Sequence, residues 1–160
     1  MRQIHIIILI ETCKGDVNKK NEIFIVEDDA ISAKWMKEFL ISRGYSVDHA
    51  PDGQKALDVY SAHRHLVVIT DIEMPVMDGE ELIDHLVGTG NDSVIIVETV
   101  YREVSLIIGI MKKSVYDYII KPADPQDISI KINRAFETAK LRKMKYITER
   151  EKLIRLEKSA

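Results

Sequence analysis

Side chains that can do chemistry follow four apolar runs of the sequence. They are Glu27 and Asp28 after residues 23–26, Asp71 after 66–70, Thr99 after 94–98, and Lys121 after 115–120. Carboxylates held close together repel each other and partly protonate unless a cation neutralises them. Mg²⁺ prefers oxygen ligands, accepts one or two carboxylates and leaves positions for phosphate oxygens. The pattern therefore predicts an acidic magnesium site with an ammonium and a hydroxyl beside it.

Such a site suits the transfer of a phosphoryl group. A metal ion, an ammonium and a hydroxyl around one carboxylate stabilise the charge that spreads over the equatorial oxygens during transfer. A carboxylate can itself be the nucleophile in this chemistry. Asp71, at the end of a continuous apolar run, is the predicted nucleophile.

The elements that must position these residues alternate regularly along the chain. Apolar runs predict strands at 23–28, 66–70, 94–98 and 115–120, and residues 46–50 are a further predicted strand. Helical spacing predicts helices at 30–43, 53–63, 79–86, 104–111 and from about 125. Strict alternation predicts an α/β fold with a parallel sheet and helices on both faces. In such sheets the reactive crevice lies beyond the carboxyl ends of the strands. The chemically useful residues should meet at that edge.

The composition is that of one globular domain in a reducing cytoplasm. The chain has 160 residues, 46% hydrophobic and 31% charged, and its formal net charge of −3 gives no general reason to bind nucleic acid or an acidic membrane. The single cysteine, Cys13, excludes an internal disulfide and a cysteine-rich zinc site. The histidines share no metal-ligand spacing and are expected at the surface; they are His5, His49, His63, His65 and His85.

Both ends of the chain are predicted to lie outside the main fold. Residues 1–22 are an expected extension whose apolar run 4–10 is far shorter than the roughly 20 residues of a membrane span. That run is either part of a tail, an extra edge strand, or a strand that pairs with another chain. Residues 138–160 are rich in charge and lack proline and glycine, so they should continue the last helix outward. That helix either stays solvated or dimerises, and its basic residues 140–145 precede no recognisable DNA-binding module.

Four motifs together resemble the receiver domain of two-component response regulators over residues 23–137. They are VEDD (26–29), TDIEMPVMDG (70–79), Thr99, and DYIIKP (117–122), in the order typical of that family. The resemblance implies a flavodoxin-like, doubly wound five-stranded parallel sheet of order 2-1-3-4-5. It also implies a CheY-like signalling switch that catalyses only its own Mg²⁺-dependent phosphorylation and dephosphorylation, rather than an enzyme with a separate substrate.

The resemblance assigns roles around the phosphoacceptor. Asp71 would accept a phosphoryl group from a sensor histidine kinase or a histidine phosphotransfer protein. Asp28 and Asp71 would bind Mg²⁺ directly, with the backbone carbonyl of Glu73 as a further ligand and Glu27 acting through water. Lys121 would pair with the phosphoryl group.

The resemblance also implies how a signal leaves the site. Thr99 would swing toward the phosphoryl oxygens, Tyr118 would move from outward to inward, and the bond from Lys121 to Pro122 would be cis. The surface formed by the fourth helix, fifth strand and fifth helix would then change its population of states. This surface or the C-terminal helix could form a homodimer. Exposed residues of the first helix, with Ile31 and Lys34 as candidates, would face the kinase.

Two departures from the family pattern carry expectations. Val100 stands where a small residue is usual, so we expect slow dephosphorylation and poor reaction with acetyl phosphate. Ser114 and Val115 replace the usual Gly-Ala before the fifth strand, which puts the local turn in question. The alternative function is an unphosphorylated receiver fold that serves for docking or dimerisation; the intact set of acids, Thr99 and Lys121 favours the phosphorylated switch.

Overall fold

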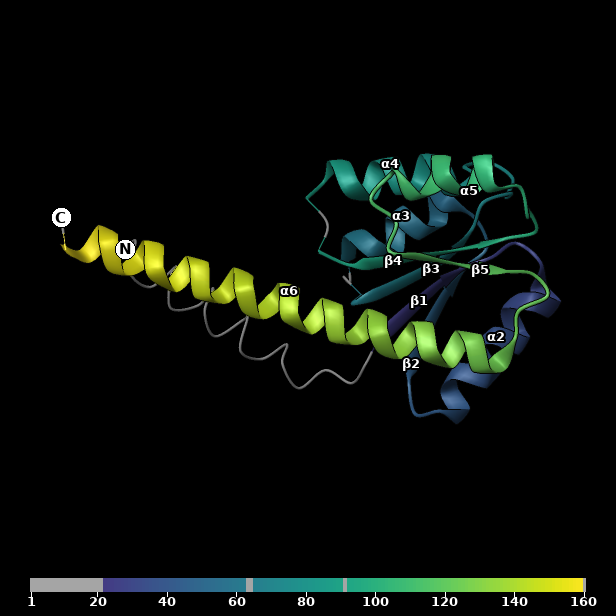
Figure 1. Cartoon of the computed structure of the whole chain (residues 1–160), viewed down its shortest axis with the longest axis horizontal. Coiled ribbons are helices and arrows are strands. Elements are labelled where there is room, and N and C mark those ends of the chain that lie inside the picture. The colour runs from purple at the N-terminus through teal and green to yellow at the C-terminus, as the bar shows by residue number, and fades with distance from the viewer. Residues whose placement is uncertain (1–21, 63–64, 91, 160) are drawn as a thin grey trace.

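Five parallel strands form the centre of the molecule in the computed structural model, which describes residues 22–62, 65–90 and 92–159. The strands are β1 (Glu22–Val26), β2 (Ser46–Ala50), β3 (Val67–Asp71), β4 (Val94–Thr99) and β5 (Asp117–Ile120). Their order is β2-β1-β3-β4-β5, and every neighbouring pair is parallel (Figure 1). The predicted fold class and strand order are therefore confirmed.

Helices cover both faces of this sheet. They are α2 (Ala30–Ser42), α3 (Gly53–Ala62), α4 (Gly79–Gly88), α5 (Val104–Met111) and α6 (Pro125–Ser159). One core packs the sheet against α2 and α6, and the other packs it against α3, α4 and α5 (Figure 1). Alternate residues of each strand enter opposite cores, as Ile25 and Phe24 of β1 do. The central strands β1, β3 and β4 are largely apolar because both of their faces are buried, whereas β2 at the edge of the sheet carries the exposed Ser46 and Asp48.

The connection from β3 to α4 folds back tightly beneath Asp71. Asp78 caps α4 by accepting a hydrogen bond from the backbone nitrogen of Glu81, and the Glu81 side chain in turn accepts one from the backbone nitrogen of Asp78. A Cβ atom on Gly79 would lie 2.0 Å from the carbonyl oxygen of Asp71, so only glycine fits there. The capped helix therefore holds the end of β3 at a fixed position.

The turn before β5 contains a serine in an unusual backbone conformation. Ser114 has a φ of 65°, in the left-handed region that glycine adopts most readily. Val115 after it is buried in the core beside α3, α4 and α5. The turn questioned from the sequence is thus formed by a serine in a strained backbone conformation.

The expectation that all histidines lie at the surface is wrong for His65. Its side chain is buried, stacks on Phe24 with ring centroids 4.7 Å apart, and lies 2.7 Å through Nε2 from an Asp48 carboxylate oxygen. His49 is half-buried, with Nε2 2.8 Å from the carbonyl oxygen of Glu27. Spacing in the sequence could not show these contacts because they form between separate elements.

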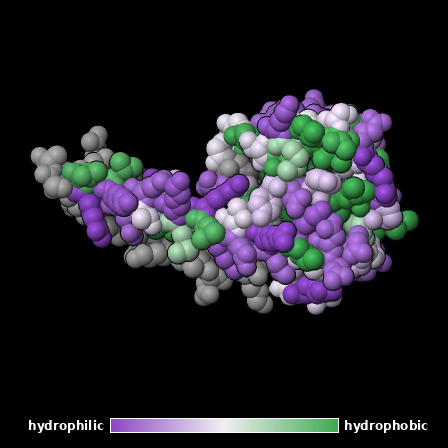
Figure 2. All heavy atoms as spheres, in the orientation of Figure 1, coloured by the Kyte–Doolittle hydropathy of each residue, from purple (hydrophilic) through white to green (hydrophobic). Residues whose placement is uncertain are grey.

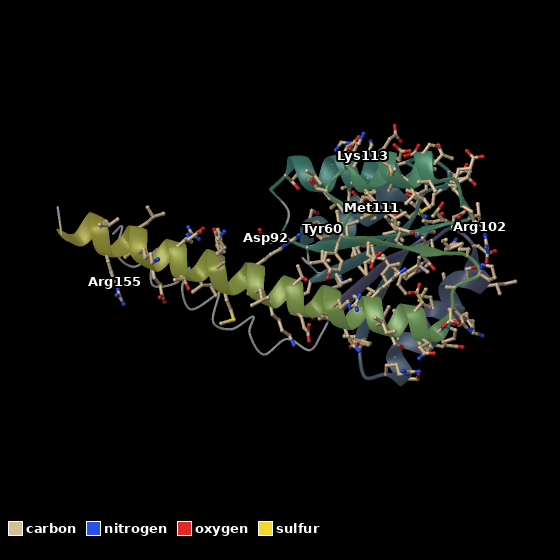
Figure 3. The ribbon with its side chains drawn as sticks, in the orientation of Figure 1. Tyr60, Asp92, Arg102, Met111, Lys113 and Arg155 are labelled. Atoms are coloured by element: carbon tan, nitrogen blue, oxygen red, sulfur yellow. The ribbon has the colours of Figure 1, made fainter. Side chains whose placement is uncertain are left out.

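Helix α6 runs for 35 residues without interruption, which confirms the predicted extended C-terminal helix. Its first half buries Ile128, Ile132 and Phe136 against the sheet. Its second half leaves the domain at the edge opposite the carboxyl ends of the strands; Figure 3 shows Arg155 there and Arg102 at the far end of the molecule. Figure 2 shows this half as largely hydrophilic with separate hydrophobic patches.

Some expectations fall on residues that the structure does not describe. They include the predicted extension 1–22 apart from Glu22, with its apolar run 4–10, and the positions of Cys13, His5 and His63. Within the described ranges, none of the helices combines the length and apolar character that crossing a membrane requires.

Candidate functional site

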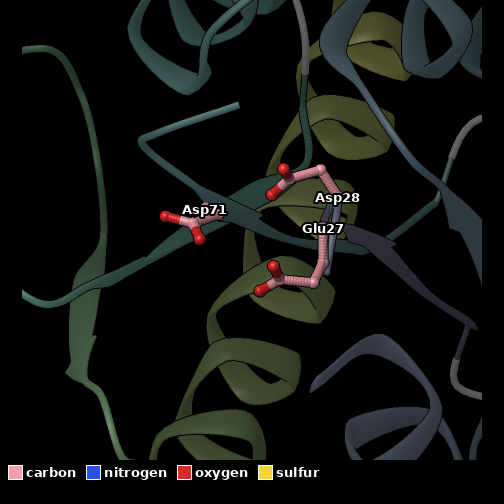
Figure 4. A group of neighbouring side chains, drawn as sticks. All are labelled: Glu27, Asp28 and Asp71. Carbon is pink, nitrogen blue, oxygen red and sulfur yellow. The ribbon is translucent and has the colours of Figure 1, made fainter. Parts of the chain in front are cut away.

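Three carboxylates meet at the carboxyl ends of β1 and β3. Glu27 and Asp28 follow β1, and Asp71 is the last residue of the neighbouring β3. Each offers an oxygen within 4.8 Å of the oxygens of the other two (Figure 4). Glu27 is 1% exposed, whereas Asp28 is open to solvent. The cluster thus has a buried side and an accessible side.

Lys121 joins two of these carboxylates. Its Nζ donates a hydrogen bond to Glu27 Oε2 at 2.5 Å and another to Asp71 Oδ2. Burial of Lys121 opposes its charged form, but these hydrogen bonds outweigh burial and hold its pKa above the ordinary value. The ammonium is therefore firmly protonated.

One ammonium does not balance three carboxylates. The oxygens that lie on the open side of the cluster, from Asp28 and Asp71, are hard donors of the kind that Mg²⁺ binds. A cleft of about 680 Å³ borders the cluster on the α4 side and is lined in part by Asp28, Glu73 and Tyr101. The charge, the donor set and the access therefore fit a divalent magnesium ion.

The loop after β3 adds a backbone donor to the site. The Glu73 nitrogen lies 3.2 Å from Asp71 Oδ1 and donates a hydrogen bond to it. Asp71 therefore receives a backbone N–H on one oxygen and the Lys121 ammonium on the other. Both contacts orient the carboxylate.

Thr99 and Tyr101 border the site from β4. Thr99 is the last residue of β4 and is 1% exposed; its Oγ1 accepts a hydrogen bond from the Tyr101 nitrogen at 3.0 Å. The Tyr101 hydroxyl donates a hydrogen bond to Glu73 Oε1, and this bond raises the pKa of Tyr101. Tyr101 thus links the loops that follow β4 and β3. In the described part of the chain, Thr99 makes no hydrogen bond to Asp71.

Tyr118 lies away from the carboxylates. Its half-buried ring packs beside the core of α3, α4 and α5, and the Lys131 ammonium lies 5.1 Å from the ring centre. Its role as a switch stays a prediction. The peptide bond between Lys121 and Pro122 is cis.

The residues expected to face a kinase lie on α2. Ile31 is 80% exposed, and Lys34 is exposed and pairs with Glu38 at 3.8 Å. Val100, in the loop after β4, is 56% exposed. All three are open to solvent, and their roles stay predictions.

Sequence reasoning missed Glu98 as a functional candidate. Glu98 pairs in register with Asp71 across β3 and β4, and it is 4% exposed. Burial raises its pKa to about 7, although the Lys121 charge opposes that rise. The available signal was an acid inside an otherwise apolar buried strand, next to Thr99 but directed to the other face.

Known proteins resemble this chain in sequence over most of the described domain. Residues 23–133 match the family model of the response regulator receiver domain. Response regulator MprA of Mycobacterium tuberculosis is 36% identical over 100 residues, which cover 62% of this chain and 44% of that protein. Regulatory protein AtoC of Escherichia coli is 27% identical over 123 residues, covering 77% of this chain and 27% of that protein. The chain therefore spans less than half the length of these curated relatives.

A solved structure resembles this chain in fold. The response regulator receiver domain protein from Clostridium thermocellum superposes with a TM-score of 0.70 at 27% identity, covering 75% of this chain and 97% of that one. The match covers nearly the whole solved domain.

Proposed function

Since the chain belongs to the response regulator receiver domain family, we propose that it is a switch whose Asp71 accepts a phosphoryl group. In this reaction an Asp71 carboxylate oxygen bonds to phosphorus, and the phosphorus–nitrogen bond of a phosphohistidine breaks. The donor imidazole keeps the electron pair of that bond. The observation that carries the proposal is the position of Asp71, which ends a buried strand and is contacted by the Lys121 ammonium and the Glu73 backbone N–H.

We assign the metal ligands among the residues of the cluster. Asp28 and Asp71 would hold Mg²⁺ directly, with the backbone carbonyl of Glu73 as a further ligand and Glu27 acting through water. Bound Mg²⁺ would supply positive charge that offsets the phosphoryl oxygens. Glu27 also keeps Lys121 in place, because the two side chains are hydrogen-bonded and Glu27 is buried.

Lys121 and Thr99 would contact the phosphoryl group on Asp71 and so respond to its presence. The Lys121 ammonium already bonds an Asp71 oxygen, so it is placed to pair with a phosphoryl oxygen attached there. The Thr99 hydroxyl would turn from its bond with the Tyr101 nitrogen toward the phosphoryl group. Tyr118 would follow it, and the face made of α5, β5 and α6 would carry the change to a partner.

The domain division follows from the same proposal. Residues 23–137 act as the receiver, and residues 138–160 act as the helix through which a change at the receiver reaches a partner or a second copy. A sensor histidine kinase or a histidine phosphotransfer protein would supply the phosphoryl group. Homodimers would use the α5–β5–α6 face or the projecting part of α6.

Mass spectrometry of the intact chain tests the proposal. Phosphoramidate, which carries a phosphorus–nitrogen bond, should add about 80 Da, one phosphoryl group, in the presence of Mg²⁺. The addition should be absent in Asp71→Asn and after metal removal with EDTA. Asp92→Asn is the matched control, because Asp92 is an exposed aspartate just before β4, at the amino ends of the strands (Figure 3).

The outcome separates a phosphorylated switch from an unphosphorylated docking module. No added mass in the native chain, or an addition that persists in Asp71→Asn, would refute the role of Asp71. An addition of the same extent in EDTA would refute the role of the metal.

A further inference from the structure

A second pocket lies beside the acidic cluster, on the opposite side of Lys121. Its volume is about 580 Å³, and it opens between α2 and the loop that follows β5. The lining is largely apolar and includes Ile31, Trp35, Glu98, Val100, Lys121 and Pro122. The pocket shares Lys121 with the phosphoacceptor site, whereas Glu98 has no role there.

Glu98 places a carboxyl group at this apolar pocket. Its side chain is 4% exposed, yet across the described ranges no hydrogen bond or ion pair reaches its carboxyl oxygens. Lys121 is the cationic residue of the lining, and it donates its hydrogen bonds to Glu27 and Asp71 rather than to Glu98. A carboxyl group that is mostly withdrawn from solvent and has no hydrogen-bond partner among the described residues is costly, so a ligand that supplies a donor or a positive charge here is stabilised.

The rim of the pocket is apolar and accessible. Ile31 is 80% exposed, Val100 56% and Trp35 42%. Apolar side chains gathered around an opening mark a surface that another molecule covers. A ligand that fits both features has an apolar stem for the rim and a positive charge for Glu98. Lysine and arginine side chains combine these properties.

We propose that this pocket receives a lysine or arginine side chain of the protein that docks over α2 to phosphorylate Asp71. The stem of that side chain packs between Trp35 and Pro122, and its charged end pairs with Glu98. A protein is favoured as the source because Lys121 borders both the pocket and Asp71, so a macromolecule that reaches Asp71 also covers the pocket. The choice of this partner rests on the proposed function.

Trp35 allows a direct test, because it is the only tryptophan of the chain and lines the pocket. The probe is n-butylguanidinium, which mimics the end of an arginine, and n-butylurea is its neutral counterpart. Both are titrated at constant ionic strength while tryptophan fluorescence is recorded. We expect a saturable change with the cation and an affinity at least about tenfold weaker for the urea, as a charge-assisted hydrogen bond implies.

Variants identify the group that recognises the cation. Glu98→Gln keeps the shape of the side chain and should weaken n-butylguanidinium binding at least about tenfold. Glu38→Gln, which neutralises an exposed carboxylate on α2, should leave the affinity unchanged. Equal affinities for the cation and the urea would overturn the proposal, and so would an unchanged affinity in Glu98→Gln. The comparison of the two probes needs only the native chain.

Two further measurements separate the possible reasons for failure. Sedimentation of the native chain and of Glu98→Gln tests whether a second copy fills the pocket; self-association that is lost in the variant would overturn the choice of partner. Phosphorylation of the native chain by phosphoramidate is followed on the same samples. Cation binding without phosphorylation would keep the pocket's chemistry but refute a phosphodonor as its occupant, and phosphorylation without cation binding would refute the pocket alone.

Discussion

Replacing Glu98 by glutamine should make the protein more stable at high pH but not at low pH. Glu98 is 4% exposed, and burial raises its pKa from 4.5 to about 7. Between these values the folded chain holds a proton on Glu98 that the unfolded chain has released. The free energy of unfolding of the native chain therefore falls as the pH rises from about 4.5 to about 7, and the loss levels off above that range.

The size of this effect follows from the two pKa values. Each tenfold change in proton affinity corresponds to about 1.4 kcal/mol, so ionising Glu98 in its buried position costs about 3 kcal/mol. The amide of Glu98→Gln does not ionise and avoids this cost. The stability of the variant relative to the native chain should thus rise by about 3 kcal/mol between pH 4.5 and pH 8.

Urea unfolding at several pH values measures this difference. EDTA is present throughout so that no metal alters the acidic cluster. Taking the difference between two chains cancels the groups that titrate in both, and Glu38→Gln, which removes an exposed carboxylate on α2, is measured alongside as the matched control. A relative stability of Glu98→Gln that stays constant within about 0.5 kcal/mol, or that falls with pH, would refute the assignment of a high pKa to Glu98.

Three other substitutions, one of them paired with a control substitution, test the loops around the site. Gly79→Ala should destabilise the fold by more than about 2 kcal/mol in urea unfolding, because its Cβ atom would lie 2.0 Å from a backbone oxygen. Gly88→Ala, whose Cβ atom would meet nothing within 4 Å, should stabilise the fold by up to about 1 kcal/mol. Equal effects of the two substitutions would contradict the steric argument. Val100→Ala should speed both dephosphorylation and reaction with acetyl phosphate, followed by intact mass, and two unchanged rates would show that Val100 does not restrict access. Glu73→Gln should lower the raised pKa of Tyr101 toward 10, followed by the ultraviolet absorbance of the phenolate, and an unchanged titration curve would contradict the hydrogen bond between them.

Most of the fold was predictable because each strand and helix has a strong local pattern. The apolar run that ends at Asp71 predicts a buried parallel strand, and the carboxyl ends of such strands meet at one edge. The sequence alone therefore places Glu27, Asp28 and Lys121 near Asp71, where their side chains lie. The long C-terminal helix was predictable from the absence of proline and glycine.

The parts that were not predictable depend on contacts between distant segments. The hydrogen bond from Tyr101 to Glu73 joins residues 28 positions apart in two loops, and no local pattern indicates it. His65 was expected at the surface, but stacking on Phe24 buries it. Glu98 could be seen in the sequence as an acid in an apolar strand, yet only the packing of α2 and Pro122 shows that it borders a pocket.

Because α6 is long, a small tilt near the sheet becomes a larger displacement at its free end. At 1.5 Å per residue, the 20 residues beyond Ala139 extend for about 30 Å from the last turn that packs on the sheet. A tilt of about 5° at that turn would displace the free end by about 3 Å, roughly the donor–acceptor distance of a backbone hydrogen bond. Small rearrangements of the core under α6 are therefore magnified at its tip, and inserting a single residue would swing every side chain beyond the insertion around the axis by about 100°.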